Sequence, residues 1–96
     1  MSEEFTGPPW AVDCTQDAEK YRLALAGPPR EALWEALFEL RTARNPYRGD
    51  NVEPARSTVP RGPHIAYFDN NRGWIRFTFL ARVAEPQIVV EEIFWQ

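Results

Sequence analysis

The 96-residue sequence contains only one cysteine, one histidine and one methionine. A single cysteine has no partner in its own chain for a disulfide, and Cys14 with His64 offers too few soft ligands for a metal site. No apolar run reaches the roughly 18 residues that a membrane helix needs. The acidic start, Met1-Ser2-Glu3-Glu4-Phe5, lacks the apolar segment of a secretory signal. We therefore expect a cytoplasmic protein with no metal, no cofactor and no membrane segment.

Lysine is nearly absent as well, and Lys20 is the only one in the sequence. The net charge of −3 argues against nucleic-acid binding, but the charge is unevenly distributed. Residues 1–40 carry eight acids and three bases, whereas residues 41–82 carry three acids and eight arginines. The planar guanidinium group suits phosphate recognition and base stacking. The middle of the chain therefore has the charge that a polyanion would bind, although a GC-rich genome also favours arginine over lysine without any function.

Periodic segments predict a single α+β domain over residues 10–96, after a flexible tail at residues 1–9. Thr15 is typical of a helix N-cap, Gly27 of a helix stop, and the two prolines that follow it of a helix start. The expected elements are a strand at 10–14, helices at 15–26 and 28–44, a long loop at 46–63, and strands at 64–68, 73–81 and 87–95. This order, β-α-α-β-β-β, predicts a helical hairpin packed on one face of a mostly antiparallel four-stranded sheet.

The strand at 73–81 is the most informative segment. Its side-chain alternation places Ile75 and Phe77 on a core face and Trp74 and Arg76 on the other. A guanidinium beside an indole is suited to gripping a phosphate and stacking a base. Two structural interpretations stand equally well on the spacing alone: a solvated face, or a salt bridge from Arg76 to an acid on the next strand.

Three features together resemble the RelE/ParE superfamily of toxins from bacterial type II toxin–antitoxin systems. They are the element order, the segment Leu40…Asn45-Pro46-Tyr47-Arg48-Gly49 and the strand Trp74-Ile75-Arg76-Phe77. The resemblance covers about residues 10–95. It implies growth inhibition either by RelE-like, metal-independent cleavage of mRNA, often on the ribosome, or by ParE-like inhibition of DNA gyrase. In both cases it implies a complex with a cognate antitoxin.

For a RelE-like endoribonuclease, the resemblance assigns Arg76 to the scissile phosphate. Arg61 and His64 complete the catalytic candidates, while the RNA-binding candidates are Arg48, Arg56, Arg72 and Trp74. The reaction would be attack of a ribose 2′-OH on the adjacent phosphate, which requires a base, an acid and positive charge. By alternation His64 and Tyr67 face opposite sides of their strand, so at most one of them lies beside Arg76.

The sequence departs from the family pattern in three respects. The basic loop has no lysine, and arginine stays protonated and serves poorly as a general base. We expect no counterpart to the C-terminal extension that carries a catalytic tyrosine or histidine in several members. Glu91 and Glu92 add negative charge to the last strand. Three hypotheses therefore remain: a RelE-like ribonuclease, a ParE-like toxin without nuclease activity, and a small protein-binding module without catalysis. Exposed tryptophan and phenylalanine side chains would serve the third equally well.

Overall fold

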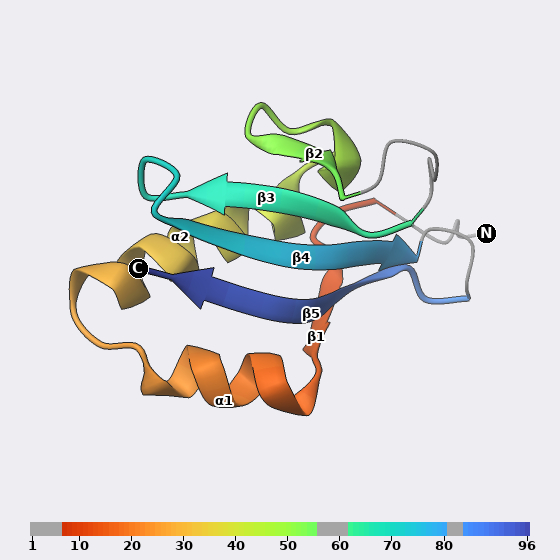
Figure 1. Cartoon of the computed structure of the whole chain (residues 1–96). Coiled ribbons are helices and arrows are strands. Elements are labelled where there is room, and N and C mark those ends of the chain that lie inside the picture. Colours follow the sequence, from red (N-terminus) through yellow and green to blue (C-terminus); the bar gives the residue numbers. More distant parts are fainter. Residues whose placement is uncertain (1–6, 56–61, 81–83) are drawn as a thin grey trace.

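The computed structural model describes residues 7–55, 62–80 and 84–96, which form two α-helices and a five-stranded sheet (Figure 1). The strands are β1 (Ala11–Cys14), β2 (Val52–Pro54), β3 (His64–Phe68), β4 (Gly73–Leu80) and β5 (Gln87–Trp95), and the helices are α1 (Gln16–Ala24), α2 (Pro28–Thr42) and the short 3₁₀ helix η1 (Pro46–Arg48). The strand order is β1-β5-β4-β3-β2. None of the helices in these ranges is long and apolar enough to cross a membrane.

The α+β class and the order of the predicted elements are confirmed, but the predicted four-stranded sheet is wrong in detail. A fifth strand, β2, lies inside the segment expected to be a loop and pairs with β3. It has only three residues and ends in Pro54, so its sequence shows no alternation of apolar and polar side chains from which a strand could be predicted. In addition, β1 pairs with β5 in parallel, whereas the other strand pairs are antiparallel. Most of the predicted tail at residues 1–9 lies outside the described residues.

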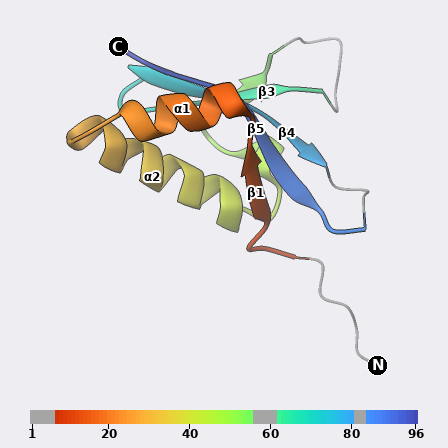
Figure 2. The same cartoon turned by 90° about the horizontal axis from the view of Figure 1, so that it is seen from below.

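The helices begin where the sequence predicts. The Thr15 hydroxyl accepts a hydrogen bond from the Ala18 N–H at 3.2 Å, which confirms it as the α1 N-cap, and α2 starts at Pro28. The role predicted for Gly27 is wrong: α1 already ends at Ala24, and Gly27 is instead the N-cap of α2 with φ of 68°. A positive φ combined with a ψ of −148° is a conformation that glycine adopts readily, and at this position the chain turns from α1 into α2, which together form a V-shaped hairpin (Figure 2).

The core lies between the sheet and the helical hairpin. Ile75 and Phe77 of β4 and Val90 of β5 are fully buried and pack with Leu33 and Leu40 of α2. Burying each of these side chains contributes about 1.5–3 kcal/mol. Alternation in β3 and β4 turns every second residue toward this core, so the intervening residues lie on the opposite face, which no described helix covers.

A β-bulge interrupts the pairing of β4 with β5. Arg76 pairs with Glu92 and Phe77 with Val90, which leaves Glu91 as the extra residue. A bulge changes the alternation of its strand, so two consecutive residues point to the same face. Here Glu91 and Glu92 both lie on the uncovered face beside Arg76.

Candidate functional sites

Arg76 lies on the uncovered face of the sheet, where alternation predicts it, but the two glutamates hold it. Its Nε donates to Glu91 Oε1 at 3.2 Å, and its Nη1 is 2.8 Å from Glu92 Oε1. The second oxygen of Glu91 accepts a hydrogen bond from the Thr78 hydroxyl at 2.9 Å. Two carboxylates around one guanidinium give a cluster with a net negative charge, which repels phosphate. The interpretation of Arg76 as a salt-bridge residue is therefore confirmed.

The aromatic neighbour predicted for RNA binding also has a partner within the sheet. The Trp74 ring stacks on Phe94, with centroids 5.7 Å apart and an interplanar angle of 25°. Arg72 belongs to the adjacent hairpin, where its guanidinium lies 4.6 Å from the centre of the Trp95 ring. Arg48 is exposed at the end of η1. Within the described residues, neither Arg72 nor Arg48 joins the hydrogen-bond network of Arg76.

His64 lies on the other side of the sheet from Arg76, which corrects the expectation that the two share a catalytic site. It pairs with Phe77 and is only 4% exposed, whereas Ile65 stands opposite Arg76. Its ring stacks on Tyr47 at 3.7 Å between centroids, and its Nδ1 lies 2.9 Å from the Gly62 carbonyl oxygen. The imidazole is thus a buried packing residue on the core face and has no path through the sheet to a phosphate at Arg76.

Tyr67 is on the same face as Arg76 but is engaged elsewhere. Its hydroxyl donates to Glu53 at 2.8 Å, and this hydrogen bond is the main reason that the pKa of Tyr67 is raised. A tyrosine with a raised pKa is a poor base at neutral pH. Arg56 and Arg61 lie outside the described residues. The described residues therefore place no acid–base pair around Arg76.

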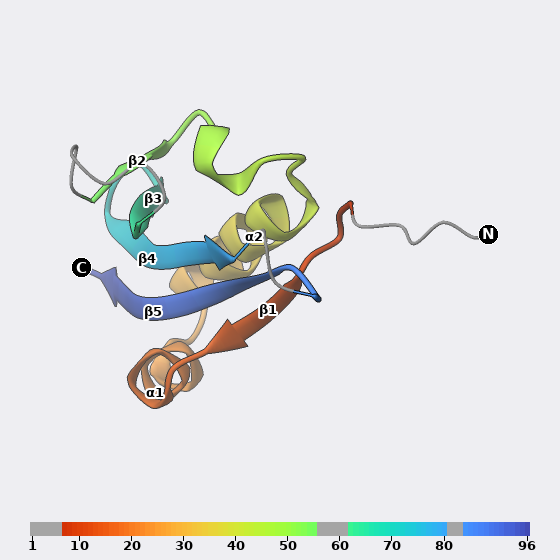
Figure 3. The ribbon, with the colours of Figure 1, turned by 90° about the vertical axis from the view of Figure 1, so that its right-hand side faces the viewer.

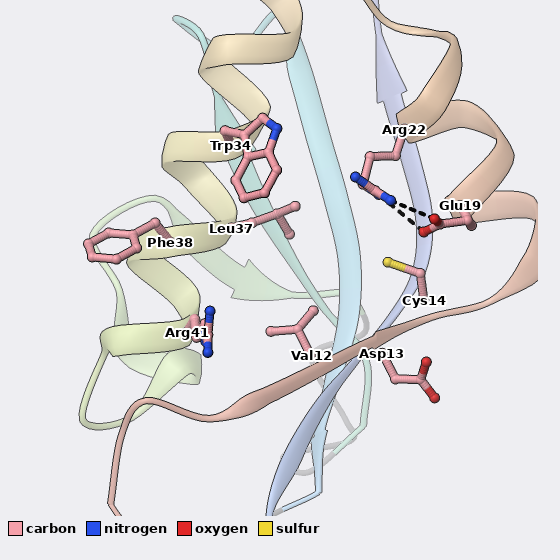
Figure 4. A pocket seen from close by; sticks show the side chains of 9 residues that line it. All are labelled: Val12, Asp13, Cys14, Glu19, Arg22, Trp34, Leu37, Phe38 and Arg41. Atoms are coloured by element: carbon pink, nitrogen blue, oxygen red, sulfur yellow. Dashed lines mark hydrogen bonds and ion pairs between the residues drawn. The ribbon is translucent and has the colours of Figure 1, made fainter.

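A pocket of about 490 Å³ lies between α1, α2 and β1 (Figure 4). We call it the helix groove, and its lining residues are Val12, Asp13, Cys14, Glu19, Arg22, Trp34, Leu37, Phe38 and Arg41. Trp34 and Phe38 stand one turn apart on the α2 wall and are 56% and 63% exposed. The helical periodicity assigns both residues to a widened apolar face. The periodicity of α2 does not predict that α1 and β1 form the opposite wall of the groove, because the position of that wall depends on the angle between the two helices.

The polar side chains of the helix groove include no reactive nucleophile. Glu19 and Arg22 form an ion pair, with Arg22 Nε donating to Glu19 Oε1 at 3.1 Å, and this contact lowers the pKa of Glu19. The pKa of Cys14 is raised, first by burial and then by the charge of Glu19. A thiol held in its protonated form is a weak nucleophile. Arg41 is exposed and forms no ion pair with any described residue.

The chain matches no protein-family model, no curated protein sequence and no solved structure. In the described ranges, no three histidine, cysteine or acidic side chains are grouped so that they would hold a metal ion. The function of the chain therefore has to be inferred from its own residues, and the two sites described above differ in kind. One is a neutralised arginine on an open sheet face, and the other is an apolar groove with exposed aromatic walls.

Proposed function

We propose that the chain is a protein-binding domain without catalytic activity, and that the helix groove receives the partner. The observation that supports this most is the pair Trp34 and Phe38, both more than half exposed on one wall of the groove. Large aromatic side chains dominate the energetics of protein interfaces, and a clustered exposed pair marks an interaction site. Covering Trp34 and Phe38 would contribute about 1.5–3 kcal/mol for each ring that becomes fully buried.

The RelE/ParE resemblance suggests what kind of protein this partner is. Under it, the chain would be a cytoplasmic toxin and the partner its cognate antitoxin. A ParE-like toxin without nuclease activity, or a module without toxicity, accords with the lack of an acid–base pair around Arg76 in the described residues. Gyrase supercoiling assayed with and without the purified chain tests the ParE-like form. Normal growth of cells that express the chain would reject both the ParE-like and the RelE-like toxin.

The second candidate is a RelE-like endoribonuclease that cleaves mRNA, and the position of Arg76 favours it. The side chain of Arg76 is 41% exposed on the face that no described helix covers, so an RNA strand has access to it. The RNA would have to displace Glu91 and Glu92 from the guanidinium. Incubation with translating ribosomes and a defined mRNA tests this candidate. If the wild-type chain cuts the mRNA in the ribosomal A site and the Arg76→Ala variant does not, this candidate is supported. If the wild-type chain makes no cuts in the mRNA, this candidate is rejected.

Selection of peptides tests the binding function directly. A phage-displayed library of random dodecapeptides is selected on the purified chain, and the enriched peptides are synthesised. We expect peptides whose Kd rises at least about tenfold with Phe38→Ala, a hot-spot effect, and stays unchanged with Leu23→Ala. Leu23 is the matched control, because it is also 63% exposed but does not line the helix groove. Failure to enrich any peptide that depends on Phe38 would reject the proposed function.

A further inference from the structure

One edge of β1 has backbone groups that face away from the sheet. In a parallel pair of strands, the backbone N–H and C=O groups of successive residues point alternately toward the neighbouring strand and away from it. The Thr15 N–H donates to the Val90 carbonyl at 2.9 Å, so Thr15 is one of the residues of this segment whose backbone groups point toward β5. Asp13 accordingly turns its N–H and C=O toward β5, whereas those of Val12 and Cys14 point outward. Beyond the β1–β5 pair, none of the described residues forms a hydrogen bond with the backbone of Val12 or Cys14.

The open part of this edge coincides with the helix groove. Trp10 also turns its N–H outward, but there the end of α2 closes the edge, because the Arg41 carbonyl accepts that hydrogen bond at 2.8 Å. The next outward residues, Val12 and Cys14, line the helix groove with their side chains. Figure 3 shows β1 as the outermost described strand beyond β5, followed directly by α1. A ligand that fills the groove therefore also covers the free backbone groups of Val12 and Cys14.

This coincidence distinguishes between two kinds of ligand. A helix satisfies its own backbone internally, so a helix in the groove would remove water from the Val12 and Cys14 groups without replacing their hydrogen bonds. Burying polar backbone groups in this way is unfavourable. An extended segment supplies the missing partners, since its alternate N–H and C=O groups pair with a strand edge while its side chains enter adjoining pockets.

We propose, on the basis of the protein-binding function above, that the helix groove binds an extended segment of a partner protein that pairs with the outer edge of β1. Alternate residues of this segment are apolar and contact Leu37, Trp34 and Phe38. The segment also carries a carboxylate near Arg41, which is exposed and lacks an ionic partner among the described residues. The ligand is thus an acidic, alternating β-strand.

N-methylation of the selected dodecapeptides tests this binding mode. Each amide of a peptide that depends on Phe38 is methylated in turn, which removes one hydrogen-bond donor at a time. We expect methylation at alternate positions to raise the Kd at least about tenfold, while the intervening positions tolerate it. The amide hydrogen exchange of Val12 and Cys14 should slow at least about tenfold in the complex, and that of Asp13, already paired with β5, should change less.

The side-chain part of the proposal has its own matched pair of variants. Arg41→Gln should raise the Kd of the acidic peptides several-fold, whereas Arg30→Gln should not, because Arg30 lies on α2 outside the helix groove. If Arg41→Gln leaves the Kd unchanged, the assignment of a carboxylate to this position is overturned. These comparisons use exposed side chains, so neither variant threatens the core.

The possible outcomes separate this proposal from the protein-binding function. Peptides that depend on Phe38 but leave the exchange of Val12 and Cys14 unchanged would overturn the strand pairing and keep the groove as a binding site for a helix. Concentration-dependent dimers that Phe38→Ala dissociates would make a second copy of the chain the occupant, and would overturn the proposal of a different partner. If no enriched peptide depends on Phe38, the protein-binding function itself fails.

Discussion

The hydroxyl of Tyr21 bonds to both backbone groups of Trp95: it accepts from the N–H at 2.9 Å and donates to the C=O at 3.0 Å. Trp95 lies beyond Val90, the last residue of β5 that pairs with β1. Tyr47 does the same for Phe79, accepting from the N–H at 2.8 Å and donating to the C=O at 3.4 Å. In both places a tyrosine hydroxyl takes the position of a strand partner, because β1 ends at Cys14, opposite Val90, and β3 begins at His64, opposite Phe77.

Replacing Tyr21 with phenylalanine should lower the free energy of unfolding by about 1–3 kcal/mol, because the N–H and C=O of Trp95 lose their partner without gaining another. The matched control is Tyr67→Phe, whose hydroxyl bonds to the side chain of an exposed residue, Glu53. That change should cost about 1 kcal/mol or less. Urea unfolding of the three proteins measures the differences. Equal losses in the two variants would contradict the role of Tyr21 at the sheet edge.

The second tyrosine of this kind, Tyr47, should make the fold sensitive to alkaline pH. Its pKa is raised above 10.0, chiefly by burial, so the folded state favours the neutral phenol. Its contribution to stability is therefore complete below about pH 10 and is lost as the pH rises through the raised pKa. Unfolding measured from about pH 8 to pH 11 should show a steeper loss for the wild-type chain than for Tyr47→Phe. Parallel curves would contradict this. Tyr67, whose pKa is also raised, is present in both proteins and cancels.

Much of the secondary structure could be predicted, because it depends on local chemistry. Thr15 caps a helix through its own hydroxyl, Pro28 suits a helix start, and the turn at 69–71 takes positive φ at residues that tolerate it. The role of Gly27 was harder to predict, since a glycine between two helices suits either the end of one or the start of the next. The strand β2 depends on β3 for its hydrogen bonds, and three residues ending in Pro54 give no local signal.

Cys14 should be a slowly reacting thiol that serves as a reporter for the helix groove. Burial and the charge of Glu19 raise its pKa above 9.0, and only the thiolate reacts with iodoacetamide. At neutral pH its alkylation should be slower than that of free cysteine and should accelerate as the pH rises. Glu19→Gln should speed the reaction, because it removes a negative charge beside the sulfur and frees Arg22. Asp17→Asn is the control, since Asp17 is exposed in the same first turn of α1. A rate unaffected by Glu19→Gln would contradict the assigned cause.

The candidate sites were less predictable than the elements, because both depend on register and packing. Alternation correctly places Arg76 on the face opposite Phe77, and it correctly separates His64 from Tyr67. The same rule would put Glu91 and Glu92 on opposite faces. The bulge puts both beside Arg76, and a bulge is a property of how two strands pair. The helix groove likewise requires the angle between two helices, which the sequence of either helix leaves undetermined.

Releasing Arg76 from its two glutamates should create a polyanion site on the uncovered face of the sheet, where the two carboxylates now surround the guanidinium. In the double variant Glu91→Gln/Glu92→Gln, the amides keep hydrogen-bond acceptors beside the guanidinium, while the cluster loses both negative charges. We expect poly(U) to bind the double variant at least about tenfold more tightly than it binds the wild-type chain, with an affinity that falls as salt rises. Fluorescence anisotropy of labelled poly(U) at several salt concentrations measures both effects. Adding Arg76→Ala should abolish the gain, because the guanidinium supplies the charge; a gain that survives would place the RNA contact elsewhere and remove the main support for the ribonuclease candidate.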